Sequence, residues 1–138
     1  MKYFILSLIL LCCSVFVKGQ NQYSAEPSPV LLKERWEAEW ITCPESSLYD
    51  YGVYHFRKTL TLDSQLDSFI INISADNRYR LFVNGKPVCW GPARGDIYHW
   101  YFDTVDIASL LRPGKNVLAV LVWNFGSYTP GAQMTLKT

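Results

Sequence analysis

The 138-residue chain has little of what several functional classes need. It contains four cysteines, two methionines and two histidines, and its 13 basic side chains nearly balance 12 acidic ones. A chain so close to neutral has no charge surplus with which to attract a nucleic acid. Eight glycines and seven prolines without a repeat exclude a collagen-like chain, and a 49% hydrophobic content excludes a disordered one. A single compact domain is the class that remains.

Catalytic patterns are also missing. All five glutamates precede Tyr49 and the aspartates are scattered, so no pair stands out as a general acid and base. The sequence has no Gly-x-Ser-x-Gly turn and no phosphate-binding glycine loop. Arg94-Gly95-Asp96 matches an integrin-binding tripeptide, but its aromatic surroundings indicate a structural loop. We therefore name no catalytic residue.

The N-terminus has the form of a secretory signal. Lys2 precedes an apolar run from Tyr3 to Val17, and Gly19 completes a small-residue cleavage site. A membrane anchor is the alternative, but the run is shorter than the roughly 20 residues of a spanning helix. Lipid attachment at Cys12-Cys13 is a second alternative, which Leu10-Leu11 disfavours because a lipoprotein has a small residue before its cysteine. We expect an exported protein, periplasmic or extracellular, with no membrane partner after cleavage.

Removal of the signal would leave Cys43 and Cys89 as the cysteines of the mature chain. Export permits a disulfide between them, and a buried apolar thiol at each position is the alternative. Neither cysteine belongs to a CxxC pair or to a Cys/His cluster with zinc spacing. No metal site of that type is predicted.

Beyond Trp36 the sequence alternates with the period of half-buried strands. Residues 98–105 are predicted as an aromatic strand, and the apolar run 116–123 is typical of a strand buried on both faces. Two rows of apolar residues recur at nearly every second position, one made of Phe56, Leu60 and Leu62 and the other of Phe69, Ile71 and Ile73.

The strongest local signal is Asn84-Gly85 between two strand-like runs, which predicts a β-hairpin with a type I′ turn. Asp106 is a candidate N-cap for a short helical turn that Pro113-Gly114 ends. A last strand begins at Met134. Seven or eight short strands without a long helix indicate an all-β fold, specifically a β-sandwich.

We divide the chain into three parts. Residues 1–19 form the predicted signal peptide and residues 20–35 a polar, flexible leader with two prolines. Residues 36–138 form the sandwich domain. The chain reaches Thr138 inside a predicted strand, which either ends there or belongs to a longer protein.

Two clusters are candidates for binding a sugar. Asp76, Asn77 and Arg78 interrupt an apolar row just before the hairpin. They form either a tight turn or a polar rim whose carboxylate, amide and guanidinium bond sugar hydroxyls. The second cluster is a Gly/Pro loop between indoles. Its rings and charged groups suit contact with a sugar or packing against a neighbouring domain, and its rings alone suit the core. It contains Trp90, Arg94, Asp96, His99 and Trp100.

Several stretches carry a family resemblance. Residues 51–58 (YGVYHFRK) and 74–88 (SADNRYRLFVNGKPV) closely resemble the N-terminal β-sandwich of secreted bacterial α-L-rhamnosidases. The similarity extends from about residue 36 to the end. Its hairpin portion also occurs in β-galactosidase-type enzymes, whereas the loop GPARGD and the stretch WNFG make the match narrower. Further support comes from residues 40–41, 113–119 and 130–133.

The resemblance implies a galactose-binding-like jelly roll placed before a helical (α/α) barrel. In that family the barrel supplies the paired glutamates of an inverting hydrolysis that releases terminal rhamnose, and no residue here matches a barrel motif. We therefore expect a non-catalytic module, truncated at its C-terminus relative to the family, whose partner is the catalytic barrel or a rhamnose-containing glycan. An autonomous carbohydrate-binding module and a gene fragment without its own role are the alternatives. No cofactor is expected; calcium, used by some related modules, has no ligands here that match residue by residue.

Overall fold

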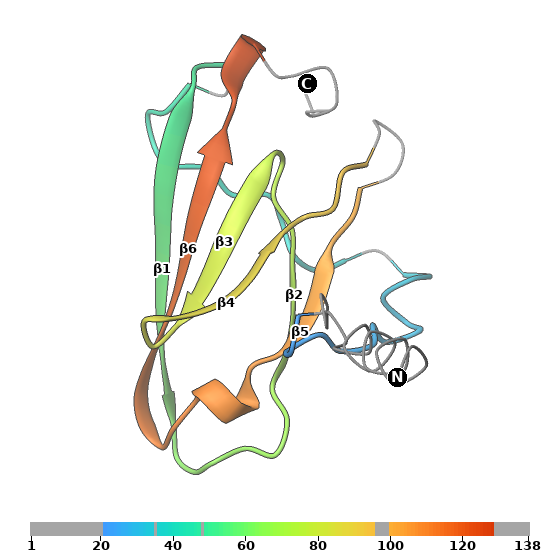
Figure 1. The fold of residues 1–138 in the computed structure, drawn as a ribbon, viewed down its shortest axis with the longest axis vertical. Helices are drawn as coiled ribbons and strands as arrows, with labels where there is room; N and C mark the ends of the chain where they lie inside the picture. Colours follow the sequence, from blue (N-terminus) through green and yellow to red (C-terminus); the bar gives the residue numbers. More distant parts are fainter. Residues whose placement is uncertain (1–20, 35, 48, 96–99, 129–138) are drawn as a thin grey trace, which may run out of the picture.

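The computed structural model describes residues 21–34, 36–47, 49–95 and 100–128. These residues form two antiparallel sheets that face each other, and their helical elements are the short 3₁₀ turns η1 (Ala108–Leu110) and η2 (Gly126–Tyr128). Figure 1 shows the larger sheet beside the pair β2 and β5. The predicted all-β sandwich is confirmed.

The larger sheet has the strand order β1-β6-β3-β4, so the last strand lies between the first and third. Its long pair runs in full register, with Gly52 opposite Asn124 and Leu62 opposite Gly114. The smaller sheet pairs β2 with β5. The strand bounds are β1 (Gly52–Leu62), β2 (Ile70–Ile73), β3 (Arg78–Val83), β4 (Lys86–Gly91), β5 (Asp103–Asp106) and β6 (Gly114–Asn124).

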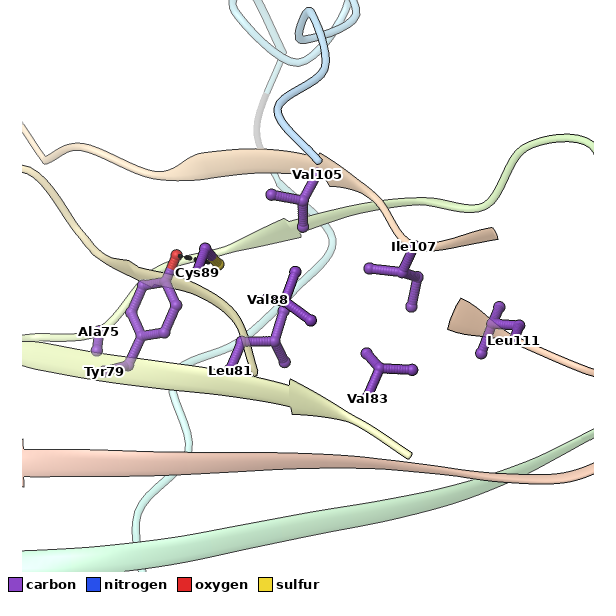
Figure 2. Close-up of a cluster of buried hydrophobic side chains, with 9 residues drawn as sticks. All are labelled: Ala75, Tyr79, Leu81, Val83, Val88, Cys89, Val105, Ile107 and Leu111. Carbon is purple, nitrogen blue, oxygen red and sulfur yellow. Dashed lines mark hydrogen bonds between the residues drawn. The ribbon is translucent and has the colours of Figure 1, made fainter. Parts of the chain in front are cut away.

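Along the strands, every second side chain points into the core between the two sheets. In β3 the side chains of Tyr79, Leu81 and Val83 are buried, whereas the residues between them are half-buried. All of the second predicted apolar row packs on this core, as do Leu60 and Leu62 of the first, which confirms those parts of the two rows. Figure 2 shows its buried members: Ala75, Tyr79, Leu81, Val83, Val88, Cys89, Val105, Ile107 and Leu111.

The predicted hairpin joins β3 to β4. Asn84 and Gly85 both take positive φ, 49° and 81°, as a type I′ turn requires. The Asn84 side chain also ties the turn to its surroundings, because its Oδ1 accepts a 2.9 Å bond from Val117 N and its Nδ2 donates to Leu110 O at 2.8 Å. The turn is therefore fixed by its sequence and by its contacts.

Asp106 sits where β5 ends and the predicted helical turn begins as η1. Its Oδ1 accepts the N–H groups of Ala108 and Phe69, each at 3.0 Å, and its Oδ2 accepts the hydroxyl of Ser68 at 2.7 Å. These bonds lower the pKa of Asp106, the backbone N–H of Phe69 most. The N-cap of η1 is Ile107, so the prediction of Asp106 as the N-cap is wrong. Asp106 instead joins the smaller sheet to the turn through its bonds to Phe69 and Ala108.

Two strand predictions need correction. Strand β5 begins at Asp103 rather than residue 98, because the aromatic residues before it pack on the N-terminal segment: Phe102 lies 4.7 Å from Trp36, centroid to centroid. Strand β6 is half-buried along most of its length instead of buried on both faces, because one face of the larger sheet carries no second layer of described strands. The predicted strand at Met134 lies outside the described residues.

Part of the segment predicted as a leader is attached to the smaller sheet. Ser24 forms an isolated bridge with Val105. Ala25 N donates to Thr104 O at 3.0 Å, and Asp106 N donates to Tyr23 O at 2.9 Å. Tyr23 also packs against the core. The predicted signal peptide at residues 1–19 lies outside the described residues.

Candidate functional site

Five of the residues predicted to bind sugar lie at one end of the sandwich, where β3 and β5 begin and β4 and β6 end (Figure 1). We call this region the loop end and define it as residues 74–78, 91–95, 100–103 and 125–128. Asp76, Asn77, Arg78, Arg94 and Trp100 belong to it. Asp96 and His99, also predicted, lie outside the described residues.

Asn77 holds the loop end together. Its side chain is only 3% exposed. Its Oδ1 accepts a 2.7 Å bond from Phe125 N, and its Nδ2 donates to Asp76 Oδ2 at 3.3 Å. Arg78 Nη1 donates to Pro92 O. The cluster therefore joins three loops, because its side chains bond backbone groups in the segments that contain Phe125 and Pro92.

A second polar contact closes the core beneath the loop end. Tyr79 is buried, and its hydroxyl donates to Asp103 Oδ2 at 2.5 Å. The same hydroxyl lies 3.6 Å from Cys89 Sγ, the contact drawn as a dashed line in Figure 2. Burial raises the pKa of Tyr79 and of the Cys89 thiol, so both groups stay protonated at neutral pH.

Gly91 lets Asp103 approach. A Cβ placed on Gly91 would overlap Asp103 Oδ2, and it would lie 2.7 Å from the Tyr79 ring. The carboxylate thus fills the space that a side chain at position 91 would occupy. Cys89 and Cys43 are both free thiols, so the disulfide alternative is wrong, and Cys89 is the predicted buried thiol.

Exposed aromatic rings lie at the other side of the loop end. Trp100 packs edge-on against Trp40 at 6.0 Å between ring centroids. Trp40, Ile41 and Tyr101 are 60%, 75% and 50% exposed. Arg94 is exposed on the loop that follows β4. Exposed rings and a guanidinium at one end of the sandwich are the mixture expected of a sugar contact, and equally of a surface that meets another domain.

Trp90, which the sequence groups with Trp100, lies elsewhere. It stands on the face of the larger sheet turned away from the core, stacked on Trp123 at 6.2 Å with 7° between the ring planes. Sequence reasoning did not select Trp123, Arg80 or Trp40 as site residues. The hairpin register was the available signal for Arg80, because it sets Arg80 opposite Trp90.

A shallow pocket of about 500 Å³ lies at the opposite end of the sandwich. None of the predicted site residues lines it. Its walls are Gln22, Tyr23, Asp67, Asp106, Ala108 and Ser109. Both carboxylate oxygens of Asp106 already accept hydrogen bonds, Oδ1 from Phe69 and Ala108 and Oδ2 from Ser68.

The residues that the structure describes contain no group of three or more histidine, cysteine, aspartate or glutamate side chains placed to hold a metal ion. Among the same residues, no helix has the length and apolar character needed to span a membrane.

Solved structures give the comparison that bears on family. The chain matches a GH78 family rhamnosidase of Bacillus sp. GL1 with 37% identity and a TM-score of 0.55, over 67% of this chain and 10% of that one. The predicted resemblance to a rhamnosidase domain is confirmed, and the chain spans about a tenth of that enzyme. A native alfa-L-rhamnosidase from Aspergillus terreus matches with 21% identity and a TM-score of 0.41 over 60% of this chain and 10% of that chain. No family model and no curated protein matches the sequence.

Proposed function

We propose that the chain is a non-catalytic N-terminal β-sandwich module of a secreted rhamnosidase-like glycoside hydrolase acting on rhamnose-containing glycans. In this role it supports or borders the catalytic barrel. The observation that carries the proposal is the match at 37% identity to one tenth of a GH78 family rhamnosidase. A segment of that size has room for a small domain of such an enzyme.

The use of the carboxylates supports a non-catalytic role. An acid/base pair needs two carboxyl groups that face a substrate and remain available to it. Asp76 accepts a bond from Asn77, Asp103 accepts one from Tyr79, and Asp106 accepts three bonds at the far end. These three aspartates hold loops and strands in place.

The loop end is the surface we assign to the catalytic barrel. Trp40, which packs on Trp100 of the loop end, and its neighbour Ile41 expose apolar side chains, and Tyr101 of the loop end is also exposed. Aromatic residues are enriched at protein interfaces, where burying them contributes most of the binding free energy. A neighbouring domain that covers these side chains would gain that contribution.

The test is an assay of the purified chain for hydrolysis of an aryl rhamnoside. We expect no nitrophenol above the level released by a mock purification. Release that rises in proportion to the amount of chain would contradict a non-catalytic role.

A second candidate function is an autonomous carbohydrate-binding module, favoured by the edge-on pair of Trp40 and Trp100 at the loop end. Titration of rhamnose and rhamnose oligosaccharides, followed by tryptophan fluorescence, separates the two candidates. Saturable binding that Trp100→Ala weakens would favour the binding module. An unchanged signal at millimolar sugar would leave only the structural role.

A further inference from the structure

The larger sheet has an outer face, the face turned away from the core. Register places its residues in rows across the four strands. His55 lies opposite Leu121, Leu121 opposite Arg80, and Arg80 opposite Trp90. The next row toward the loop end contains Trp123. This face carries no second layer of described strands, and nothing in the proposed function uses it.

Arg80 is the centre of an aromatic cluster on the outer face. Its guanidinium carbon lies 4.5 Å from the ring centroid of Trp90 and 5.0 Å from that of Phe82. Trp90 in turn stacks on Trp123 across β3. The stacked rings hold the guanidinium in a fixed plane, because a cation gains electrostatic energy over an aromatic face.

The guanidinium retains hydrogen-bonding capacity. Arg80 Nε is buried and has no hydrogen-bond partner among the described residues. An arginine held by rings rather than by a carboxylate still presents its planar fork, which matches a carboxylate in two parallel bonds. Because Nε is buried, the donors that a carboxylate on the outer face can meet are the two Nη groups.

All the charged side chains in the strands of the larger sheet are basic. The strands β1, β3, β4 and β6 contain no aspartate or glutamate. Their charged residues are Arg57, Lys58, Arg78, Arg80, Lys86 and Lys115. Because the whole chain is nearly neutral, this segregation gives the sheet a local attraction for anions.

The exposed side chains of the outer face favour a saccharide over a protein. Val53 and Trp90 are the large apolar residues of these four strands that rank as exposed, and Trp90 alone is aromatic, at 67%. A standard protein interface buries roughly 800 Å² on each partner around a more apolar core. A single exposed indole beside guanidinium groups suits a sugar ring, whose C–H face packs on the indole while its polar substituents reach the charges.

We propose that the outer face binds a carboxylated saccharide, that is, one containing uronic acid. The C–H face of the sugar packs on Trp90, and its carboxylate accepts two hydrogen bonds from Arg80. Arg57, on the same face two strands away, attracts the next anionic residue of the saccharide. This site is separate from the loop end and does not rest on the proposed function.

The test is calorimetric titration of the full chain with a galacturonic acid trimer, in parallel with its fully methyl-esterified form. We expect saturable binding of the acid and about 10–100-fold weaker binding of the ester, which cannot form the charge-assisted pair. Affinity for the acid is also expected to fall as sodium chloride is raised, because salt screens the exposed charges.

Variants locate the site. Arg80→Gln should weaken binding about 10–100-fold, and Arg80→Lys should also weaken it, because an ammonium lacks the planar fork. Trp90→Ala should weaken it at least roughly threefold. The matched controls are Arg112→Gln, an exposed arginine outside the strands, and Ile70→Ala on the smaller sheet, neither of which should change the affinity. Circular dichroism melting of each variant shows whether it is folded.

Three outcomes would overturn the proposal. They are equal affinity for the acid and its ester, unchanged affinity in a folded Arg80→Lys or Trp90→Ala variant, and no binding at millimolar trimer. A glutamate hexapeptide that binds as tightly as the trimer, with the same response to the variants, would also overturn it. That result would make the outer face a docking surface for an acidic protein segment.

Discussion

Asn77→Ala separates a structural from a sugar-binding role at the loop end. Asn77 is 3% exposed, so its loss deprives Phe125 N of its 2.7 Å acceptor and removes the 3.3 Å bond to Asp76. A part-buried N–H without a partner costs about 1–3 kcal/mol, and the lost bond contributes about 1 kcal/mol. We expect a destabilisation of about 2 kcal/mol, which for a domain near 100 residues lowers Tm by roughly 8–16 °C.

The assay is thermal and urea unfolding followed by circular dichroism. Ser64→Ala, an exposed loop position between β1 and β2, is the control and should leave Tm nearly unchanged. Asn77→Asp keeps the acceptor for Phe125 but sets a second carboxylate against Asp76, so its deficit should exceed that of the control at pH 7. A Tm of Asn77→Ala equal to that of the control would refute the reasoning, because the loops would then hold without this side chain.

Three further predictions concern the core and the far end. Gly91→Ala should destabilise the fold by about 1–3 kcal/mol in urea unfolding, since the new methyl group overlaps the carboxylate of Asp103. Cys89 should react with iodoacetamide far more slowly than half-buried Cys43 in peptide mapping, and urea should abolish the difference, because burial raises the pKa of its thiol and shields it. Asp106→Asn should cost more stability at pH 7 than at low pH: the lowered pKa of Asp106 gives stability that is present above the unfolded value of about 3.9 and is lost as pH falls through the folded value.

Local patterns in the sequence were sufficient for much of the fold. Alternation identified β1 and the apolar row around β2, and Asn84-Gly85 identified the hairpin, because each of these features is set by neighbouring residues. The start of β5 was wrong because aromatic residues favour strands in general. Here Phe102 finds its partner in Trp36, which is distant in sequence.

The site was harder to predict for a related reason. Asn77 lies at a bend before β3, and the bond that its side chain accepts from Phe125 spans 48 positions, so no local pattern signals it. Trp90 and Trp100 are close in sequence, yet one ends on the outer face and the other packs on Trp40. Which face a residue reaches after a strand ends depends on the loop, and apolar run length says nothing about whether another layer covers β6.

The measurement that bears most directly on the proposed function is a domain replacement in the GH78 family rhamnosidase of Bacillus sp. GL1. One variant lacks the segment that matches this chain, and in another the corresponding part of this chain replaces it. We expect the deletion to lose aryl-rhamnoside hydrolysis or thermal stability, and the replacement to restore at least part of what was lost. A deletion variant with the activity and Tm of the intact enzyme would contradict the claim that this module supports the catalytic part.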